Sequence, residues 1–251
     1  MKKEKIGIIR PCKIGDLIIS LPIGKYFFEK GYDVYWPIMS KYYKSFHEAA
    51  GHYINFIEVT NNNYFVVNSA KQELLNRGIQ KILNLTFNVG TFDDANSLMF
   101  KSNNLSFDQF IYELANVPFE NKWKLDIKRN LEKENEVFFK YSNSEKYSVC
   151  HFDVEYNKHN WAKGEPTRKG YYNLCKNKIK HNLIEILPTK GVESIFHWIK
   201  IFENAEQIFA VDSGPANLIE GLNLKNEKYF LIRAMEEKKE TPYLKNNWFI
   251  I

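Results

Sequence analysis

A carboxylate near the N-terminus stands where a strand is expected to give way to a helix. Within Ile8–Pro22, a buried strand ends at Arg10, a short loop follows, and a helix is expected to begin at Asp16. Open α/β sheets bind their ligands at the carboxyl ends of strands. A carboxylate in that place can act as a general base that deprotonates a hydroxyl group. The alternative is that Asp16 only caps the helix.

The loop before Asp16 has the composition of a ligand-binding loop. Gly15 lets a ligand approach the backbone closely, and Arg10 and Lys13 supply positive charge. We therefore expect Arg10, Lys13 and Gly15 to line a cleft. The loop lacks the spaced glycines of a dinucleotide fingerprint or a P-loop, so those two ways of binding a nucleotide are not predicted.

A second stretch has the outline of a site for phosphate or diphosphate. An apolar strand, Gln207–Val211, runs directly into Asp212 and then into a helix. Ser213 and Gly214 place a hydroxyl group and backbone N–H donors at the start of that helix, where anions are favoured. Pro215 suits the first helical position. The alternative is an ordinary capped turn between a strand and a helix.

Short apolar runs alternate with helix-like segments along the chain, which is typical of doubly wound parallel sheets. The expected strands are Lys5–Ile9, Asp33–Trp36, Ile54–Val59, Lys81–Leu85, Tyr147–Phe152, Leu183–Leu187, Gln207–Val211 and Tyr229–Ile232. The expected helices are Asp16–Lys30, Tyr42–Ala50, Ser69–Arg77, Phe107–Ala115, Val192–Phe202 and Ser213–Leu222. The final Trp248–Ile251 is either a last strand or an element packed back on the body.

One stretch interrupts this alternation. Asp126–Lys146 is rich in Lys, Glu and Asn and poor in apolar residues, so we interpret it as a linker. It divides the chain into two α/β domains, residues 1–140 and residues 141–251. A length of 251 residues accommodates two such domains only if both are small.

The composition fits a globular protein that handles anions. Apolar residues make up 44% of the chain, and 35 basic against 30 acidic side chains give a formal net charge of +5. A nucleic-acid binder usually carries denser, clustered positive charge, so no nucleic-acid partner is expected. The sequence has no apolar run that could span a bilayer, no recognisable signal peptide, and three scattered cysteines that form no disulfide framework. We therefore expect a cytoplasmic protein.

Together, the two stretches resemble glycosyltransferase family 9, the bacterial heptosyltransferases. The first reads Arg10-Pro-x-x-Ile-Gly-Asp-x-x-x-Ser-Leu-Pro22 and the second reads Val211-Asp-Ser-Gly-Pro-x-x-x-x-Glu-Gly-Leu222. The resemblance implies a shortened member with a GT-B-like fold, in which two Rossmann-like domains with parallel sheets face a cleft. It also implies inverting, metal-independent transfer of a heptose or other hexose-type sugar. The sugar would pass from a nucleotide-diphosphate donor to a bacterial surface glycan, such as lipooligosaccharide core or capsule.

The same resemblance gives the site residues their roles. Asp16 matches the family's proposed catalytic base, in an acceptor-side domain formed by the first half of the chain. The turn Asp212–Pro215 matches the part of the nucleotide-sugar-binding domain that holds the sugar and the diphosphate. The family's phosphate-binding lysine is best matched by Lys158, with Lys163 and Arg168 as alternatives.

The implied reaction needs no metal cofactor. The sequence has no Asp-x-Asp motif, and its nearest relatives are Asp153 with Glu155 and the adjacent Asp93 and Asp94. The implied partners are a nucleotide-sugar and a glycan or glycolipid acceptor, with peripheral contact at the cytoplasmic face of the inner membrane. The alternatives are a non-catalytic nucleotide- or glycan-binding protein of the same fold and a nucleotide-sugar epimerase.

Overall fold

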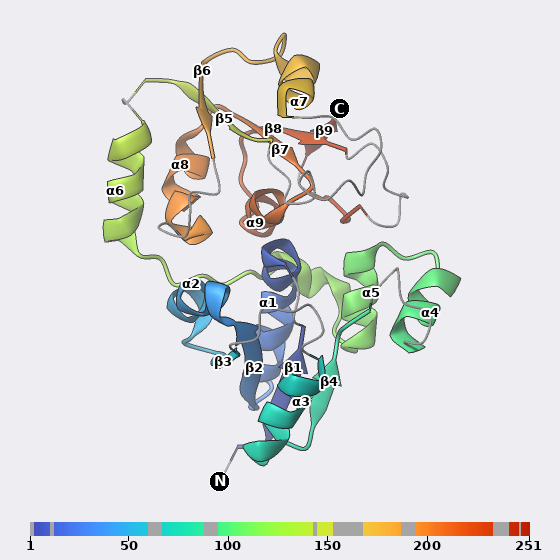
Figure 1. Ribbon diagram of the computed structural model, residues 1–251. Coiled ribbons are helices and arrows are strands. Elements are labelled where there is room, and N and C mark those ends of the chain that lie inside the picture. The colour runs from blue at the N-terminus through green and yellow to red at the C-terminus, as the bar shows by residue number, and fades with distance from the viewer. Residues whose placement is uncertain are drawn as a thin grey trace. The chain divides into compact units, whose positions relative to one another are not determined.

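The computed structural model describes most of the chain, and the structural statements below concern only that part. It comprises residues 3–10, 13–59, 67–87, 95–142, 145–152, 168–186, 194–232, 241–245 and 247–251. The chain divides into two compact units, Met1–Lys128 and Arg129–Ile251, which are coloured blue to green and green to red in Figure 1. Each unit is described by itself.

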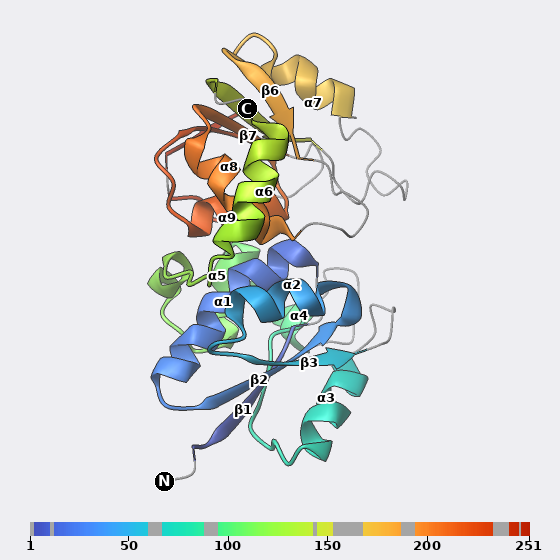
Figure 2. The ribbon, with the colours of Figure 1, turned by 90° about the vertical axis from the view of Figure 1, so that its left-hand side faces the viewer.

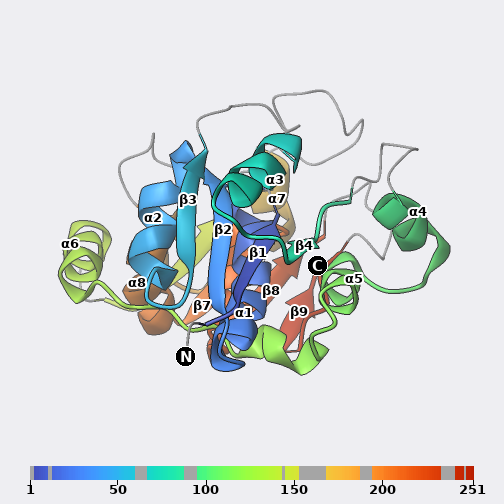
Figure 3. The same cartoon turned by 90° about the horizontal axis from the view of Figure 1, so that it is seen from below.

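The first unit is built on a four-stranded parallel sheet. Its strands are β1 (Lys5–Ile9), β2 (Asp33–Met39), β3 (Asn55–Val59) and β4 (Ile82–Asn84). Their order is β3-β2-β1-β4, which can be followed across the sheet in Figure 3. The strand order therefore reverses between β1 and β4. In open α/β sheets, such a reversal creates a crevice at the carboxyl ends of the strands, where ligands bind.

Helices cover both faces of this sheet. They are α1 (Ile14–Glu29), α2 (Ser40–Ala50), α3 (Val67–Asn76), α4 (Ala95–Ser102), α5 (Phe107–Leu114) and the 3-10 helix η1 (Phe119–Trp123). Figure 2 shows α1 and α2 on one face and α3 on the other. Because both faces are covered, the residues of β1 are apolar without alternation, and Ile6, Ile8 and Ile9 are all buried.

The second unit is built on a five-stranded parallel sheet. Its strands are β5 (Tyr147–His151), β6 (Asn182–Glu185), β7 (Gln207–Val211), β8 (Glu227–Leu231) and β9 (Trp248–Ile250). Their order is β6-β5-β7-β8-β9, so the strand order reverses between β5 and β7. The closing apolar segment is therefore a last strand, which was one of the two possibilities that its sequence left open.

The helices of the second unit include two that the sequence pattern did not predict, α6 and α7. The full set is α6 (Leu131–Tyr141), α7 (Arg168–Cys175), the 3-10 helix η3 (Ile195–Trp198), α8 (Ile199–Asn204) and α9 (Gly214–Gly221). A buried apolar cluster joins α7 to the sheet through Tyr171 and Cys175, which pack with Cys150 and Phe209. The prediction of an α/β fold with two doubly wound parallel sheets is confirmed.

The stretch interpreted as a linker is instead largely helical. α6 lies within it and belongs to the second unit, so the chain divides after Lys128 and not near residue 140. Its polar composition concealed the helix because one of its buried residues is Glu134, whose carboxylate accepts hydrogen bonds from Arg129. Asn130 caps the helix by accepting a hydrogen bond from Lys133 N at 3.1 Å.

The two residues at the boundary are each fixed to a different unit. Lys128 N donates to Ala49 O at 2.8 Å in the first unit. Arg129 pairs with Glu134 and, at 2.7 Å, with Glu203 Oε1 in the second unit. The chain therefore passes from one unit to the other over a single peptide bond.

Candidate functional site

Asp16 lies in the first turn of α1, at the carboxyl edge of the first sheet. The helix begins at Ile14, slightly earlier than predicted, and Lys13 occupies its N-cap position without a side-chain cap. The Asp16 side chain is 28% exposed, and its Oδ1 accepts a hydrogen bond from Arg10 Nη2 at 2.9 Å. The alternative that Asp16 only caps the helix is therefore not supported, because the carboxylate pairs with Arg10.

Arg10 is buried and joins two strand ends. Its side chain is 3% exposed, and its Nη1 donates to Leu85 O at 2.8 Å. Its guanidinium carbon lies 5.1 Å from the centroid of the Phe87 ring. Leu85 and Phe87 follow β4, so Arg10 connects the end of β1 to the end of β4, where the strand order reverses. Its positive charge is directed at Asp16.

The two other residues expected to line a cleft, Lys13 and Gly15, are half-buried. Lys13 is extended, and its carbonyl oxygen accepts a hydrogen bond from Leu17 N at 3.0 Å, which closes the first turn of α1. Gly15 lies within that turn and not in the loop before it. The helix therefore begins nearer to the strand than the sequence indicated, and the loop is shorter.

At the carboxyl edge of the second sheet, Ser213 and His151 are hydrogen-bonded. His151 is the last residue of β5 and is buried, while Ser213 follows the neighbouring strand β7. Ser213 Oγ lies 3.1 Å from His151 Nδ1 and donates its proton to Val211 O at 2.8 Å. Because a hydroxyl group has one proton, the ring nitrogen must be the donor toward Ser213. The pair joins β5 and β7, where this strand order reverses.

Ser213 is the N-cap residue of α9 but does not cap it through its side chain. Its Oγ accepts no hydrogen bond from the first-turn N–H groups of α9, so these groups receive no side-chain cap in the described part of the chain. Gly214 begins the helix, one residue later than predicted, and Pro215 is its second residue rather than its first; both are buried. Backbone N–H groups at a helix N-terminus favour an anion.

Asn217 lies one turn into the same helix. Its Nδ2 donates to Ser213 O at 3.1 Å. Its Oδ1 is buried and has no hydrogen-bond partner among the described residues. A buried acceptor without a partner costs about 1–3 kcal/mol, so this atom is suited to a hydroxyl or N–H group of a ligand.

The structure describes some of the remaining predicted site residues and not others. Asp212 is half-buried between β7 and α9. Lys158 and Lys163 lie outside the described residues, as do Asp153, Glu155, Asp93 and Asp94. Arg168 is described, and its guanidinium group forms an ion pair with Glu185. Arg168 is therefore already paired with a carboxylate of its own unit.

Glu220, the glutamate of the second motif, has a structural role. It is fully buried in α9, where Oε1 accepts from Lys245 N and Oε2 accepts from Trp248 Nε1, both at 2.8 Å. Glu220 therefore connects the C-terminal segment to α9.

The buried ammonium group of Lys228 donates to Leu224 O, and burial lowers the pKa of Lys228.

The motifs pointed to Ser213 but not to His151, and to Asp16 but not to the carbonyl of Leu85. His151 carried a usable signal, since it is a polar residue at the end of a fully buried strand. Leu85 carried none, because its contribution is a backbone oxygen that any residue possesses.

The described residues contain no group of three or more His, Cys, Asp or Glu side chains that could hold a metal ion. None of their helices is long and apolar enough to cross a bilayer.

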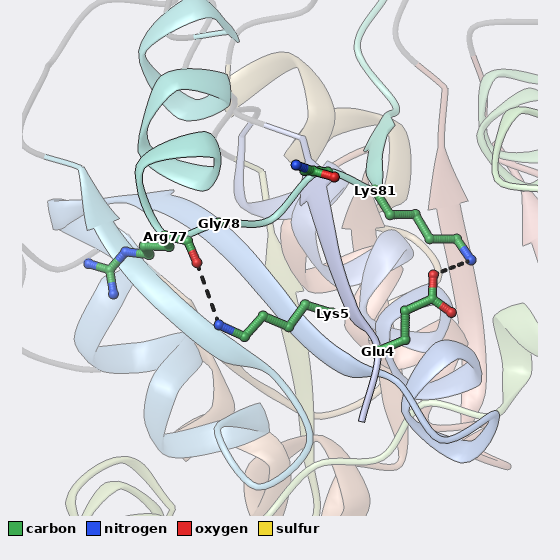
Figure 4. Close-up of a pocket in the computed structure, with 6 residues that line it drawn as sticks. Glu4, Lys5, Arg77, Gly78 and Lys81 are labelled. Carbon is green, nitrogen blue, oxygen red and sulfur yellow. Dashed lines mark hydrogen bonds and ion pairs between the residues drawn. The ribbon is translucent and has the colours of Figure 1, made fainter. Parts of the chain in front are cut away.

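A pocket of about 530 Å³ lies at the opposite, amino edge of the first sheet (Figure 4). It is lined by Glu4, Lys5, Arg77, Gly78, Gln80 and Lys81. Lys81 donates to Glu4 Oε1 at 3.2 Å and to Tyr32 Oη at 2.7 Å, and these hydrogen bonds raise its pKa. Because Lys81 is already paired, and the pocket lies away from the carboxyl ends, we do not take it as the nucleotide site.

No family model and no curated protein matches the sequence. Solved structures do match it along its whole length. A glycosyl transferase family 9 protein from Veillonella parvula superposes with a TM-score of 0.62 at 12% identity, covering 100% of this chain and 88% of its own. The E. coli ADP-heptose LPS heptosyltransferase II gives a TM-score of 0.57 at 12% identity, covering 98% and 90%. The iron-containing dodecameric glycosyltransferase TibC of enterotoxigenic E. coli gives 0.57 at 11% identity, covering 97% and 62%.

At such low identities these likenesses show the fold. The chain has the fold of glycosyltransferase family 9 structures of the GT-B type, and the resemblance inferred from its two motifs is confirmed at that level.

Proposed function

We propose that the protein is a glycosyltransferase that moves a sugar from a nucleotide-diphosphate donor to a hydroxyl group of a glycan acceptor. The observation that carries the proposal is the chemistry of the two carboxyl edges. One edge holds a partly exposed carboxylate, Asp16, and the other holds an uncapped helix N-terminus beside Ser213 and His151. A base and an anion site are the two parts that such a transfer requires.

In the proposed reaction, Asp16 takes the proton of the acceptor hydroxyl while that oxygen forms a bond to the anomeric carbon of the sugar. The bond from the anomeric carbon to the diphosphate oxygen breaks, and its electron pair leaves with the nucleoside diphosphate. Attack from the face opposite to the leaving group inverts the anomeric centre. The charge that develops on the diphosphate is stabilised by the backbone N–H groups at the start of α9, that of Ser213 included, with Lys158 as the expected cation.

The proposed substrates follow the matching structures. One of them is an ADP-heptose LPS heptosyltransferase, which supports a heptose or a related hexose-type sugar as the donor sugar. A lipooligosaccharide core or capsule glycan is the proposed acceptor, reached at the cytoplasmic face of the inner membrane. Metal independence is part of the proposal, and because TibC is iron-containing it needs its own test. Transfer that is unchanged by EDTA would support it, and transfer lost on chelation and restored by a metal would overturn it.

The proposal is tested by incubating the purified protein with a panel of nucleotide-sugars, with and without truncated lipooligosaccharide. Release of nucleoside diphosphate and the mass of the glycan are measured together. We expect release to depend on the acceptor and to add one sugar to it. Binding of nucleotide without any release would favour the non-catalytic alternative, and turnover of the donor without an acceptor would favour the epimerase.

A further inference from the structure

Neither the motif nor the proposed reaction explains why the side chain of Arg10 is buried. The Arg10 side chain is only 3% exposed, so little of its guanidinium group is accessible to a substrate. Three contacts hold its guanidinium group, one each to Leu85 O, to Asp16 Oδ1 and to the ring of Phe87. Two of these contacts come from the segment after β4, so the guanidinium group is held mainly by residues distant in the chain from α1, which carries Asp16.

The pairing with Asp16 uses only one carboxylate oxygen. A purely structural arginine–carboxylate pair is strongest when two parallel hydrogen bonds join both oxygens to the guanidinium group. Here Nη2 binds Oδ1, while Nη1 is turned toward Leu85 O. The carboxylate remains 28% exposed, and within the described chain Oδ2 has no hydrogen-bond partner. The arrangement therefore holds the carboxylate in place and leaves one oxygen for a further partner.

The position of Asp16 makes such support necessary. It lies in the first turn of α1, directly after a short loop, and Lys13 provides no side-chain cap that would fix this turn. A general base must lie within hydrogen-bond reach of the proton that it takes, and a displacement of about 1 Å can lower a rate about 100-fold. A carboxylate on the first turn of an uncapped helix gains this accuracy from a fixed partner.

We infer that Arg10 is the positioning residue of Asp16: it binds Oδ1 and thereby directs Oδ2 at the acceptor hydroxyl group. This inference rests on the proposed function. Arg10 itself does not touch the substrate, and its contribution passes through the orientation of the carboxylate. Its removal therefore lowers the rate of transfer and leaves the binding of both substrates almost unchanged.

The test is a double-mutant cycle between Arg10→Met and Asp16→Asn, with Arg10→Lys as the conservative variant. Arg77→Met is the matched control, because it removes an exposed arginine side chain directly after α3, where it pairs with Glu73. We expect Arg10→Met to lower kcat by about 10- to 100-fold with little change in the acceptor KM. Arg10→Lys should lower kcat less than Arg10→Met does. Lysine keeps the positive charge but cannot form both hydrogen bonds of the guanidinium group, to Leu85 O and to Asp16 Oδ1. The double variant should be no slower than Asp16→Asn alone, because the two residues act as one unit.

The outcomes separate this inference from the proposed function. If the wild-type protein transfers sugar and Arg10→Met does not slow it, the positioning role is overturned and the function stands. If the losses of the two single variants multiply, or if Arg10→Met raises the acceptor KM at constant kcat, Arg10 acts independently of Asp16 and the inference is likewise overturned. If the wild-type protein transfers no sugar from any donor, the function and the inference both fall. Thermal unfolding is measured for each variant. If Arg10→Met proves to be unfolded, the kcat and the acceptor KM of Arg10→Lys decide between these outcomes.

Discussion

In each of the two sheets the strand order reverses between two neighbouring strands. Different side chains connect the carboxyl ends of those two strands in the first sheet and in the second. In the first unit, the point where the strand order reverses is joined by a buried cation, Arg10, which is paired with Asp16. In the second unit, the equivalent point is joined by a hydrogen bond between His151 and Ser213. The helix that follows Ser213, α9, has no side-chain cap in the described structure.

This difference separates two chemical tasks. The first edge already contains its own cation, so what it presents outward is the carboxylate of Asp16, which repels an anion and accepts a proton. The second edge presents the N–H groups of a helix N-terminus, which favour an anion. Two sheets with the same strand-order reversal thus present different chemical groups at their carboxyl edges because of a few side chains at the strand ends.

The largest effect is expected from removing the carboxylate of the first edge. Asp16→Asn keeps the size of the side chain but cannot take a proton at neutral pH, so kcat should fall by about 10²- to 10⁴-fold. The nucleotide Kd should stay within about twofold, because the base does not contribute to ground-state binding of the donor. Release of nucleoside diphosphate and calorimetric titration measure the two quantities.

A matched control is Asp33→Asn, a half-buried aspartate at the amino end of β2. It should leave kcat near the wild-type value. An Asp16→Asn variant that also kept its turnover would show that the first edge does not supply the base.

The next largest effect is expected from placing a carboxylate at the carboxyl edge of the second sheet, as Asp16 is placed at the carboxyl edge of the first. Ser213→Asp places a carboxylate at the N-cap of α9, where aspartate is as favourable as serine for the helix. The new cap and the favourable interaction of a negative charge with a helix N-terminus oppose the loss of the hydrogen bond that Ser213 donates to Val211 O, so the free energy of unfolding should change little. The same charge repels a diphosphate, so the nucleotide affinity should fall by about 10- to 100-fold. Thermal unfolding and titration with ADP separate the two effects.

Asn130→Asp is the control for added charge at an N-cap. Asn130 caps α6 in the same unit through its side-chain oxygen, and aspartate can do the same. This variant should bind nucleotide as the wild-type protein does. Equal losses of affinity in both variants would mean that net charge, and not the second edge, governs binding.

A smaller effect is expected from His151→Phe. The phenyl ring fills the buried space but cannot donate to Ser213 Oγ, which loses its partner at 3.1 Å. One hydrogen bond contributes about 0.5–1.5 kcal/mol, so the nucleotide affinity should fall by about 2- to 12-fold, with kcat at saturating donor little changed. His181→Phe, at the amino end of β6, is the matched control and should leave the affinity unchanged. Unaltered affinity in His151→Phe would show that Ser213 acts without its partner.

The sequence predicted the elements that carry a clear apolar pattern and missed helices that lie in polar stretches, α6 and α7 among them. β1, α1 and β7 follow from continuous apolar runs, and the two motifs located both edges. α6 was interpreted as a linker because its buried glutamate, Glu134, is stabilised by Arg129, and composition does not reveal such a pair. α7 lay in a polar stretch with only Tyr171 and Cys175 buried.

The site was predictable to the same degree. Asp16 and Ser213 follow from their places after buried strands, where ligands bind. The contacts that set their chemistry join distant parts of the chain, Arg10 to Leu85 and His151 to Ser213. Such pairs depend on which strands become neighbours. The local pattern of apolar and polar residues does not determine the order of the strands in a sheet. The phosphate-binding role of Lys158 stays a prediction.

The smallest effect, no change at all, is expected when the folded protein is treated with N-ethylmaleimide. Cys150, directly before His151, and Cys175 in α7 are both fully buried behind the second edge. Burial raises the pKa of Cys150 to about 12 and that of Cys175 to about 11. The thiolate is the reactive form, and at pH 8 it makes up roughly one in ten thousand and one in a thousand of these thiols. Peptide mapping should find neither residue labelled until denaturant is added. Rapid labelling of Cys150 in the folded protein would show that the core behind the edge opens, and the losses of affinity in the Ser213 and His151 variants could then no longer be assigned to the edge alone.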